Sequence, residues 1–205
     1  FRPEVRTTWS FQKSKLTTGM GLNKETLNRT YFDSNVVFNS QYAFLQYDYN
    51  PTDKWNILAG FRYDNHQEYQ SQWSPKFAVN YKVNQNFSLE SSIGYGFKAP
   101  DFRQLYFDFS NSAIGYAVFG YNVAETKLDD LDAQGQILFR YDGIDFNSEL
   151  KPENSINFNL GSYYEKENFK WETNFFYNSI SNLIDTKAIA QKTNGQNVFS
   201  YFNSD

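Results

Sequence analysis

Gly94-Tyr95-Gly96-Phe97-Lys98-Ala99-Pro100-Asp101-Phe102-Arg103-Gln104-Leu105-Tyr106 is the stretch that decides the fold. It begins as the end of a strand, because apolar residues alternate with small or polar ones from Phe87 to Lys98. The alternation stops at Ala99-Pro100, since proline cannot donate a hydrogen bond to a strand ladder. A long segment, polar and aromatic by turns, follows over residues 99–150. A membrane-length strand that opens into a very long loop is typical of a transmembrane β-barrel.

The composition fits this interpretation. The chain has 205 residues, of which 20% are aromatic, with no cysteine, one histidine and a net charge of -4. No apolar run approaches the roughly 20 residues of a transmembrane helix, whereas a barrel strand presents only alternate residues to lipid. The absence of cysteine excludes a disulfide framework. An acidic balance without basic blocks argues against nucleic acid as a partner.

The same alternation recurs along the chain. In residues 55–63, Trp55, Phe61 and Tyr63 share one parity, and polar residues occupy most of the other. The pattern predicts strands over residues 5–11, 16–22, 43–49, 55–63, 77–83, 87–97, 156–164 and 171–177. Residues 196–205 can begin one more strand. We therefore predict roughly eight or nine antiparallel strands.

The connections alternate between short and long. Residues 50–53, 84–86 and 165–168 form short turns, whereas residues 65–74 and 99–150 form longer connections. Short turns on one side and long loops on the other match the periplasmic and extracellular sides of an outer-membrane barrel. Aromatic residues near the strand ends match an interfacial girdle. Alternating strands also occur in soluble β-sandwiches and propellers, but strands of about ten residues and the unequal connections favour the barrel.

Four motifs give the sequence a family resemblance. In order they are Phe97-Lys98-Ala99-Pro100, Leu105-Tyr106, Leu150-Lys151-Pro152-Glu153 and Asn182-Leu183-Ile184-Asp185. In this order and spacing, the chain from about Ser14 onward resembles the C-terminal half of a TonB-dependent outer-membrane receptor. Its abundance of Phe, Tyr, Asn and Lys resembles that of Bacteroidetes proteins.

The resemblance implies an all-β fold, an antiparallel transmembrane β-barrel of 22 strands with a plugged lumen. We expect residues 1–205 to be one segment of that barrel domain, with an extracellular loop over about 99–150. The plug and the TonB box would then lie outside this chain.

The resemblance also implies a function. A TonB-dependent receptor of the bacterial outer membrane imports a scarce, bulky solute, such as a ferric siderophore, haem, cobalamin or an oligomeric nutrient. Its partners would be outer-membrane lipid, a TonB-type energy-coupling protein and the solute, with a surface lipoprotein as a further candidate partner. The resemblance implies neither an enzyme nor a cofactor. A passive porin and a soluble β-rich binding domain remain the alternatives.

The candidate solute-binding residues are aromatic side chains of the long loop, because flat rings bury a large area at low entropic cost. They are Tyr106, Phe109, Tyr116, Phe119 and Tyr121, to which we add His66, the only histidine. The alternative is that these rings pack the loop against itself, and that His66 is a solvated loop residue rather than a metal or haem ligand. Relatives that take up haem tend to carry a histidine between the Ala-Pro and Leu-x-Pro-Glu motifs, and this sequence has none there. For Lys98, Lys151 and Glu153, we expect charge-assisted hydrogen bonds that hold the base of the loop.

One further motif suggests metal chemistry. Asp129-Asp130-Leu131-Asp132 begins like a calcium loop, but Tyr141 occupies the position of the bidentate glutamate. We therefore expect a solvated acidic turn and predict no metal site, with loop calcium as the alternative. With a single histidine, no Ser-His-Asp arrangement can form, and no catalytic motif is present.

Overall fold

The computed structural model describes residues 1–32, 35–111 and 113–204. The chain divides into two compact units. The first comprises residues 1–24, 39–97 and 154–180, and the second comprises residues 25–38, 98–153 and 181–205. In chain order the elements are β1 (Glu4–Ser10), β2 (Ser14–Leu27), β3 (Val36–Thr52), β4 (Trp55–His66), β5 (Gln72–Lys82), β6 (Phe87–Lys98), α1 (Phe102–Tyr106), β7 (Asp108–Ser110), β8 (Ala117–Phe119), α2 (Tyr121–Ala133), β9 (Ile137–Arg140), β10 (Glu153–Lys166), β11 (Phe169–Ser181), β12 (Leu183–Lys192) and β13 (Asn197–Ser204).

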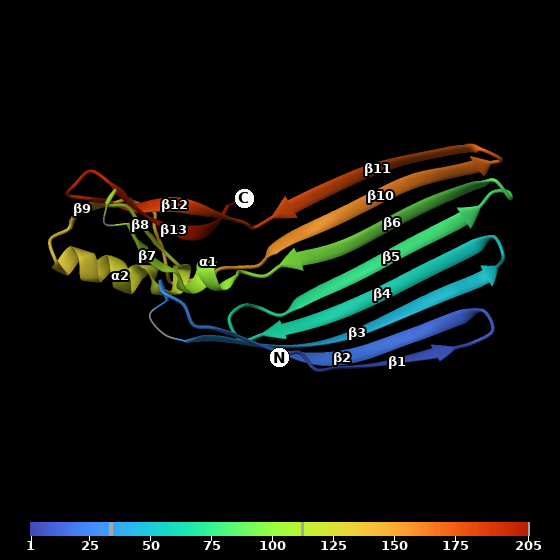
Figure 1. Ribbon diagram of the computed structural model, residues 1–205, viewed down its shortest axis with the longest axis horizontal. Helices are drawn as coiled ribbons and strands as arrows, with labels where there is room; N and C mark the ends of the chain where they lie inside the picture. Colours follow the sequence, from blue (N-terminus) through green and yellow to red (C-terminus); the bar gives the residue numbers. More distant parts are fainter. Residues whose placement is uncertain (33–34, 112, 205) are drawn as a thin grey trace. The chain divides into compact units, whose positions relative to one another are not determined.

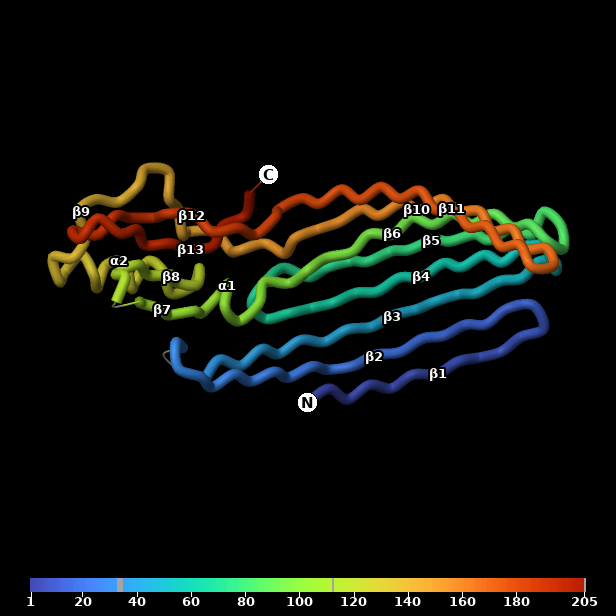
Figure 2. Tube along the Cα trace, turned by 45° about the horizontal axis from the view of Figure 1, so that its top comes forward, coloured from blue at the N-terminus to red at the C-terminus, as the bar shows by residue number. Residues whose placement is uncertain are grey.

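The first unit is built on an eight-stranded sheet. Its order is β1-β2-β3-β4-β5-β6-β10-β11, so consecutive strands are neighbours except where β10 follows β6 across residues 99–152 (Figure 1). All eight strands predicted from the alternation are present, and β3 extends to 17 residues. The short turns β1–β2, β3–β4, β5–β6 and β10–β11 lie at the same end of the sheet (Figure 2). The predicted alternation of connection length is therefore confirmed.

The two faces of this sheet differ in chemistry. Val5 lies opposite Met20, and Ala43 lies opposite Tyr63, so alternate residues of neighbouring strands share a face. One face, here called the apolar face, exposes large hydrophobic side chains that include Val5, Met20, Leu22, Leu45, Phe61, Phe77, Ile93, Ile156, Phe158 and Leu160. Exposed apolar surface of this extent marks a surface that contacts lipid or another protein.

Glycines shape the opposite, polar face. A Cβ built on Gly21 would lie 2.5 Å from Cζ of Tyr42, and one on Gly60 would lie 2.6 Å from Cε of Lys76. Likewise, a Cβ on Gly161 would lie 2.8 Å from Oε1 of Glu90. Each glycine therefore leaves room for a long side chain of the neighbouring strand to lie flat across it.

The second unit contains a separate five-stranded sheet and both helices. Its order is β7-β8-β13-β12-β9, in which β8 and β13 are parallel. The segment predicted as a long loop thus contains α1, β7, β8, α2 and β9. The strand predicted near residues 196–205 is present as β13, but it belongs to this sheet, and β12 was not predicted. Mostly antiparallel β architecture is confirmed; within the described residues, α1, α2 and the parallel pairing of β8 with β13 are exceptions.

The second unit also has the hydrophobic cores. One cluster contains Val36, Phe38, Leu105, Tyr121, Leu150, Ile184 and Tyr201. The other contains Ala117, Phe119, Ala124, Leu128, Ile189, Ala190 and Val198. Burial of these side chains supplies the hydrophobic free energy that holds α1 and α2 against the sheet.

The prediction of a solvated acidic turn is wrong, because residues 129–132 lie within α2. Asp129 and Asp132 accept hydrogen bonds from Nη2 of Arg140 at 2.8 and 2.9 Å. The hydrogen bond to Asp129, and to a smaller extent the one to Asp132, raises the pKa of Arg140 above its ordinary value. Gly135, with a φ of 68°, ends the helix, and Gln136 N donates to Leu131 O at 3.0 Å.

Two larger-scale features complete the description. Within the described residues, neither sheet closes on itself, so the structure is an open portion of a β architecture. Neither α1 nor α2 has the length and apolar character needed to cross a membrane. The assignment of residues 1–205 to a single domain stays a prediction.

The Gly21–Tyr42 packing gives a stability prediction. The Tyr42 hydroxyl donates to Oε2 of Glu4 at 2.6 Å, and the Arg62 guanidinium lies 4.0 Å from the Tyr42 ring centroid. Because Gly21→Ala forces this ring to move, we expect a loss of about 1–3 kcal/mol in the free energy of unfolding. Urea unfolding of the protein in detergent micelles measures it.

Gly94→Ala is the matched control, since a Cβ there would meet only ordinary contacts, the nearest at 3.6 Å from Cβ of Lys76. We expect it to be neutral or slightly stabilising. Equal unfolding midpoints for the two variants would show that the Tyr42 packing is unimportant.

Candidate functional site

The first feature of the second unit is the meeting of three sequence motifs at Glu153. Its Oε1 accepts a hydrogen bond from Nζ of Lys98 at 2.9 Å and another from the main-chain nitrogen of Ile184 at 3.1 Å. Glu153 is buried, whereas Lys98 is largely exposed. The ion pair expected between the two ends of residues 98–153 is therefore present, and β12 joins it.

A second connection runs through Asn203 on β13. Its Nδ2 donates to Lys151 O at 2.9 Å and to Asn182 O at 2.8 Å, and its Oδ1 accepts from Lys151 N at 2.8 Å. Lys151 thus takes part through its main chain. Asn182 has a φ of 55°, a left-handed conformation that asparagine tolerates better than most residues, and it lies between β11 and β12.

Apolar motif residues pack beside these polar connections. Leu105, Leu150 and Ile184 belong to one buried cluster. Pro100 and Pro152 are also buried, and Ala99 is half-buried. Leu183 and Asp185 are exposed on β12, and Asp185 accepts a hydrogen bond from Thr186 N. In the first unit, the Phe97 ring centroid lies 6.5 Å from that of Tyr69.

Helix α1 begins directly after this base. Asp101 caps it by accepting from Gln104 N at 2.7 Å, and the Gln104 side chain accepts from Asp101 N at 3.0 Å. This is a capping box, for which the spacing Asp101-x-x-Gln104 is the sequence signal. Phe102 then stacks on Phe38, with ring centroids 4.0 Å apart. Nearby, burial raises the pKa of Tyr201, and the positive charge of Arg103 opposes that shift.

The second feature is a cluster of aromatic rings, here called the aromatic patch: Tyr31, Phe107, Phe109 and Tyr116. Tyr31 makes edge contacts with Phe107 and Phe109, at centroid distances of 6.1 and 5.1 Å. Phe109 also lies 5.6 Å from Phe107 and 5.7 Å from Tyr116. Tyr31 is 50% exposed and has a φ of 77°. The Arg103 guanidinium lies 5.9 Å from the Phe107 ring centroid.

The predicted solute-binding residues divide between surface and core. Phe109 and Tyr116 are half-buried members of the aromatic patch. Tyr106 is half-buried and lies 6.1 Å from Phe38 between ring centroids. Phe119 and Tyr121 are buried in the two hydrophobic clusters, so in this structure they have almost no surface for a solute. Tyr31 was not predicted, although Tyr31-Phe32 is an aromatic pair in an otherwise polar connection.

His66 lies in the first unit, at the end of β4. Its ring stacks on Tyr69 with centroids 4.1 Å apart and an interplanar angle of 11°, and its Nδ1 accepts from Glu68 N at 3.1 Å. Among the described residues, no three His, Cys, Asp or Glu side chains are grouped so that they could hold a metal ion. His66 thus packs against Tyr69 at the end of β4 in this structure.

These observations define a class of protein. A sheet of long strands with one apolar and one polar face, joined by short turns at one end and long connections at the other, has the features expected of a segment of a β-barrel wall. The chain belongs to the family described as TonB dependent receptor-like, beta-barrel, whose model matches residues 4–205.

Individual relatives agree with this assignment. The chain is 26% identical over 184 residues to the probable TonB-dependent siderophore receptor PirA of Acinetobacter baumannii, covering 90% of this chain and 22% of that protein. It is 24% identical to the ferrienterobactin receptor of Escherichia coli, covering 87% of this chain and 21% of the relative. It is 26% identical to the vitamin B12 transporter BtuB of Vibrio cholerae, covering 73% and 18%.

The fold is also that of a solved receptor. The crystal structure of the siderophore receptor PirA from Pseudomonas aeruginosa matches with a TM-score of 0.79 at 19% identity, covering 100% of this chain and 36% of that one. The chain thus spans about a fifth of the length of the curated relatives.

The Glu153 connection predicts a specific loss of stability. Glu153→Gln keeps the shape but removes the charge that strengthens both hydrogen bonds, so we expect a loss of about 1–3 kcal/mol. Limited trypsin digestion should also cleave faster within residues 99–150. Urea unfolding and the digestion rate are both measured on the protein in detergent.

Glu149→Gln provides the control, because Glu149 is exposed and four residues away. We expect it to behave like the parent protein in both assays. If Glu153→Gln matched Glu149→Gln, the carboxylate would not anchor this segment.

Proposed function

We propose that this chain forms part of the wall and outer loops of a TonB-dependent outer-membrane receptor that imports a scarce, bulky solute. The observation that carries the proposal is the family match over residues 4–205, in a sheet whose apolar face is suited to lipid. The long connections of the sheet would then lie on the extracellular side. The family match favours this receptor over the passive porin and over the soluble β-rich domain.

The solute belongs to the class of metal chelates and similar bulky nutrients. One relative is named as a probable siderophore receptor, a second as a ferrienterobactin receptor and a third as a vitamin B12 transporter, which supports a ferric siderophore or cobalamin ahead of haem. The substrate contacts would come from the aromatic patch, with Arg103 beside it. Rings and a guanidinium suit a solute that has flat apolar rims and negative charge.

The rest of the machinery follows from the family. The whole receptor would be a 22-stranded barrel around a plug, with a TonB-type periplasmic protein as its energy source and with lipid around the wall. Transport of this kind changes no bond in the solute, so we assign no catalytic role. A surface lipoprotein as an additional partner and a Bacteroidetes source are compatible with the loops and the composition.

The mass of the native polypeptide is the first test of this function. The protein is extracted from outer membranes in detergent and run on a gel with and without boiling. A band that shifts on heating, with a mass several times 24.1 kDa, supports a closed barrel of which this chain is one part. A chain of that mass that stays in buffer without detergent would contradict the receptor and support the soluble domain.

The aromatic patch gives a binding prediction. In the whole receptor, we expect Phe109→Ala to weaken binding of ferric enterobactin or cobalamin, whichever probe binds, by about five-fold, since one ring contact contributes on the order of 1 kcal/mol. Binding is measured by titration of the purified receptor, and uptake by growth on that probe.

Phe139→Ala is the matched control, because Phe139 is an exposed ring of the same unit that contacts Tyr141 rather than the patch. We expect Phe139→Ala to fold in the same amount as the parent protein and to bind the probe with unchanged affinity. Equal affinities for the two variants would place the solute elsewhere.

A further inference from the structure

Arg103 lies where α1 meets the aromatic patch. Its main-chain oxygen accepts a hydrogen bond from Phe107 N at 3.2 Å, which closes the last turn of α1. Side chains four positions apart lie on the same side of a helix, and the Arg103 guanidinium accordingly lies 5.9 Å from the Phe107 ring centroid. Gln104 and Leu105, which lie between them in the sequence, are buried, whereas Arg103 is exposed. The spacing therefore presents a cation and a ring together.

The Arg103 guanidinium is restrained but has no carboxylate partner. No ion pair to it occurs in the part of the chain that the structure describes. Asp108, which lies between two patch rings in the sequence, is paired with Nζ of Lys127 at 2.7 Å, and Asp101 caps α1. Arg103 also lies near Tyr201, since its positive charge lowers the pKa of that hydroxyl against the larger effect of burial. The guanidinium therefore keeps donors for a ligand.

The rings beside Arg103 form a flat surface. Phe107 and Phe109 are parallel to within 5°, with ring centroids 5.6 Å apart. Tyr31 contacts both of them edge-on and is itself 50% exposed. A planar aromatic group of a ligand can lie against such rings while its negatively charged oxygens reach the guanidinium. The combination suits a solute that is both aromatic and anionic.

We propose that Arg103 is the charge-selecting residue of the aromatic patch, and that the solute is a ferric chelate with anionic aromatic donor groups, of the catecholate class. The inference rests on the proposed function and narrows its solute. A ferric catecholate carries several negative charges, whereas cyanocobalamin has no net charge, so the guanidinium favours the first over the second. An anionic chelate without rings gains the charge interaction but loses the contacts with Phe107 and Phe109.

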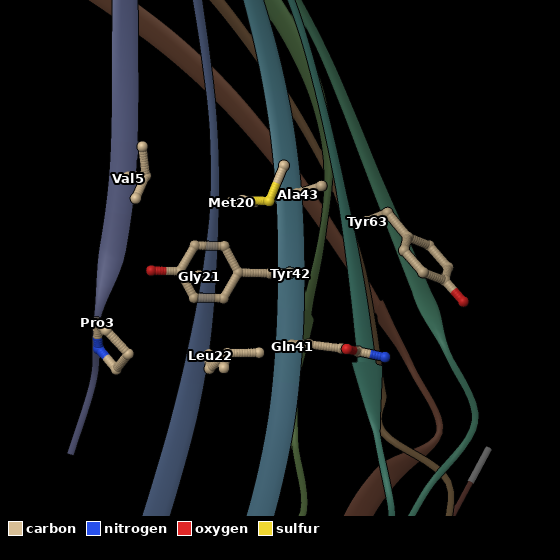
Figure 3. Close-up of a pocket in the computed structure, with 9 residues that line it drawn as sticks. All are labelled: Pro3, Val5, Met20, Gly21, Leu22, Gln41, Tyr42, Ala43 and Tyr63. Carbon is tan, nitrogen blue, oxygen red and sulfur yellow. The ribbon is translucent and has the colours of Figure 1, made fainter.

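The groove on the apolar face of the first unit offers no such selection. It has a volume of about 470 Å³ and is lined by side chains that include Val5, Met20, Ala43 and Tyr63 (Figure 3). None of its lining residues carries a charge, and the face on which it lies is suited to lipid. An anionic chelate would lose hydration there without gaining a charged partner.

The test uses the whole receptor, purified in detergent and titrated with three probes. Ferric enterobactin is anionic and aromatic, ferric citrate is anionic without rings, and cyanocobalamin has no net charge. We expect the parent to prefer ferric enterobactin and to bind it more weakly as NaCl is added, since salt screens charge interactions. Arg103→Gln should lower this affinity about ten-fold and reduce its dependence on salt. Arg103→Lys keeps the charge but loses the planar fork of donors, so its affinity should lie between the two.

Arg140→Gln is the matched control, because that guanidinium belongs to the same unit and is already bonded to Asp129 and Asp132. It should bind ferric enterobactin with the affinity and salt dependence of the parent. The heat shift on a gel confirms that each variant is folded. If Arg103→Gln and Arg140→Gln bind equally, if binding by the parent is independent of salt, or if the parent does not prefer ferric enterobactin, the inference is overturned. Such a result in a heat-shifting barrel leaves the proposed function intact, whereas a soluble chain that needs no detergent removes both.

Discussion

The second unit depends on the two hydrogen bonds that the buried carboxylate of Glu153 accepts. Its Oε1 accepts a hydrogen bond from the ammonium of Lys98, 55 positions earlier in the chain. It also accepts one from the main-chain nitrogen of Ile184, 31 positions later. A buried carboxylate is stable only with such donors, so the charge and the two chain segments require one another. Because Asn203 joins Lys151 to Asn182 in the same unit, the segment over 99–150 begins and ends at a common, fixed base. Its aromatic residues are presented from that base.

The strands of the eight-stranded sheet were predictable because apolar and polar residues alternate along each of them in the sequence. Residues 55–63 show it, and β4 follows with only its end extended to His66. The ends were less predictable. Strand β3 starts at Val36, within a region that reads as polar loop, because Val36 and Phe38 alternate into the hydrophobic core of the second unit. The residues that bury Val36 and Phe38 are distant in the sequence. A short alternating pattern does not by itself show against which residues its apolar side chains will pack.

The second unit was largely missed, for two physical reasons. Helix α2 has the helical spacing Ala124, Leu128 and Leu131 and ends at Gly135, but its run of aspartates resembles a loop. The parallel pairing of residues 117–119 with 198–200 joins segments that carry no local sign of one another. For the same reason, the sequence could nominate aromatic residues but could not separate Phe119, which is buried, from Phe109, which joins Tyr31 at the surface.

The two faces of the wall treat small residues differently. On the polar face, Gly21 is covered by the Tyr42 ring, and the space that glycine leaves is filled by protein. On the apolar face, no comparable side chain of the described residues covers Ala43, and a groove remains. A void inside a protein core loses dispersion contacts, because its neighbours are held in place. A hollow that faces lipid has no such cost, since a flexible acyl chain conforms to it. An apolar surface that faces lipid can therefore keep a shaped groove that a protein interior would fill.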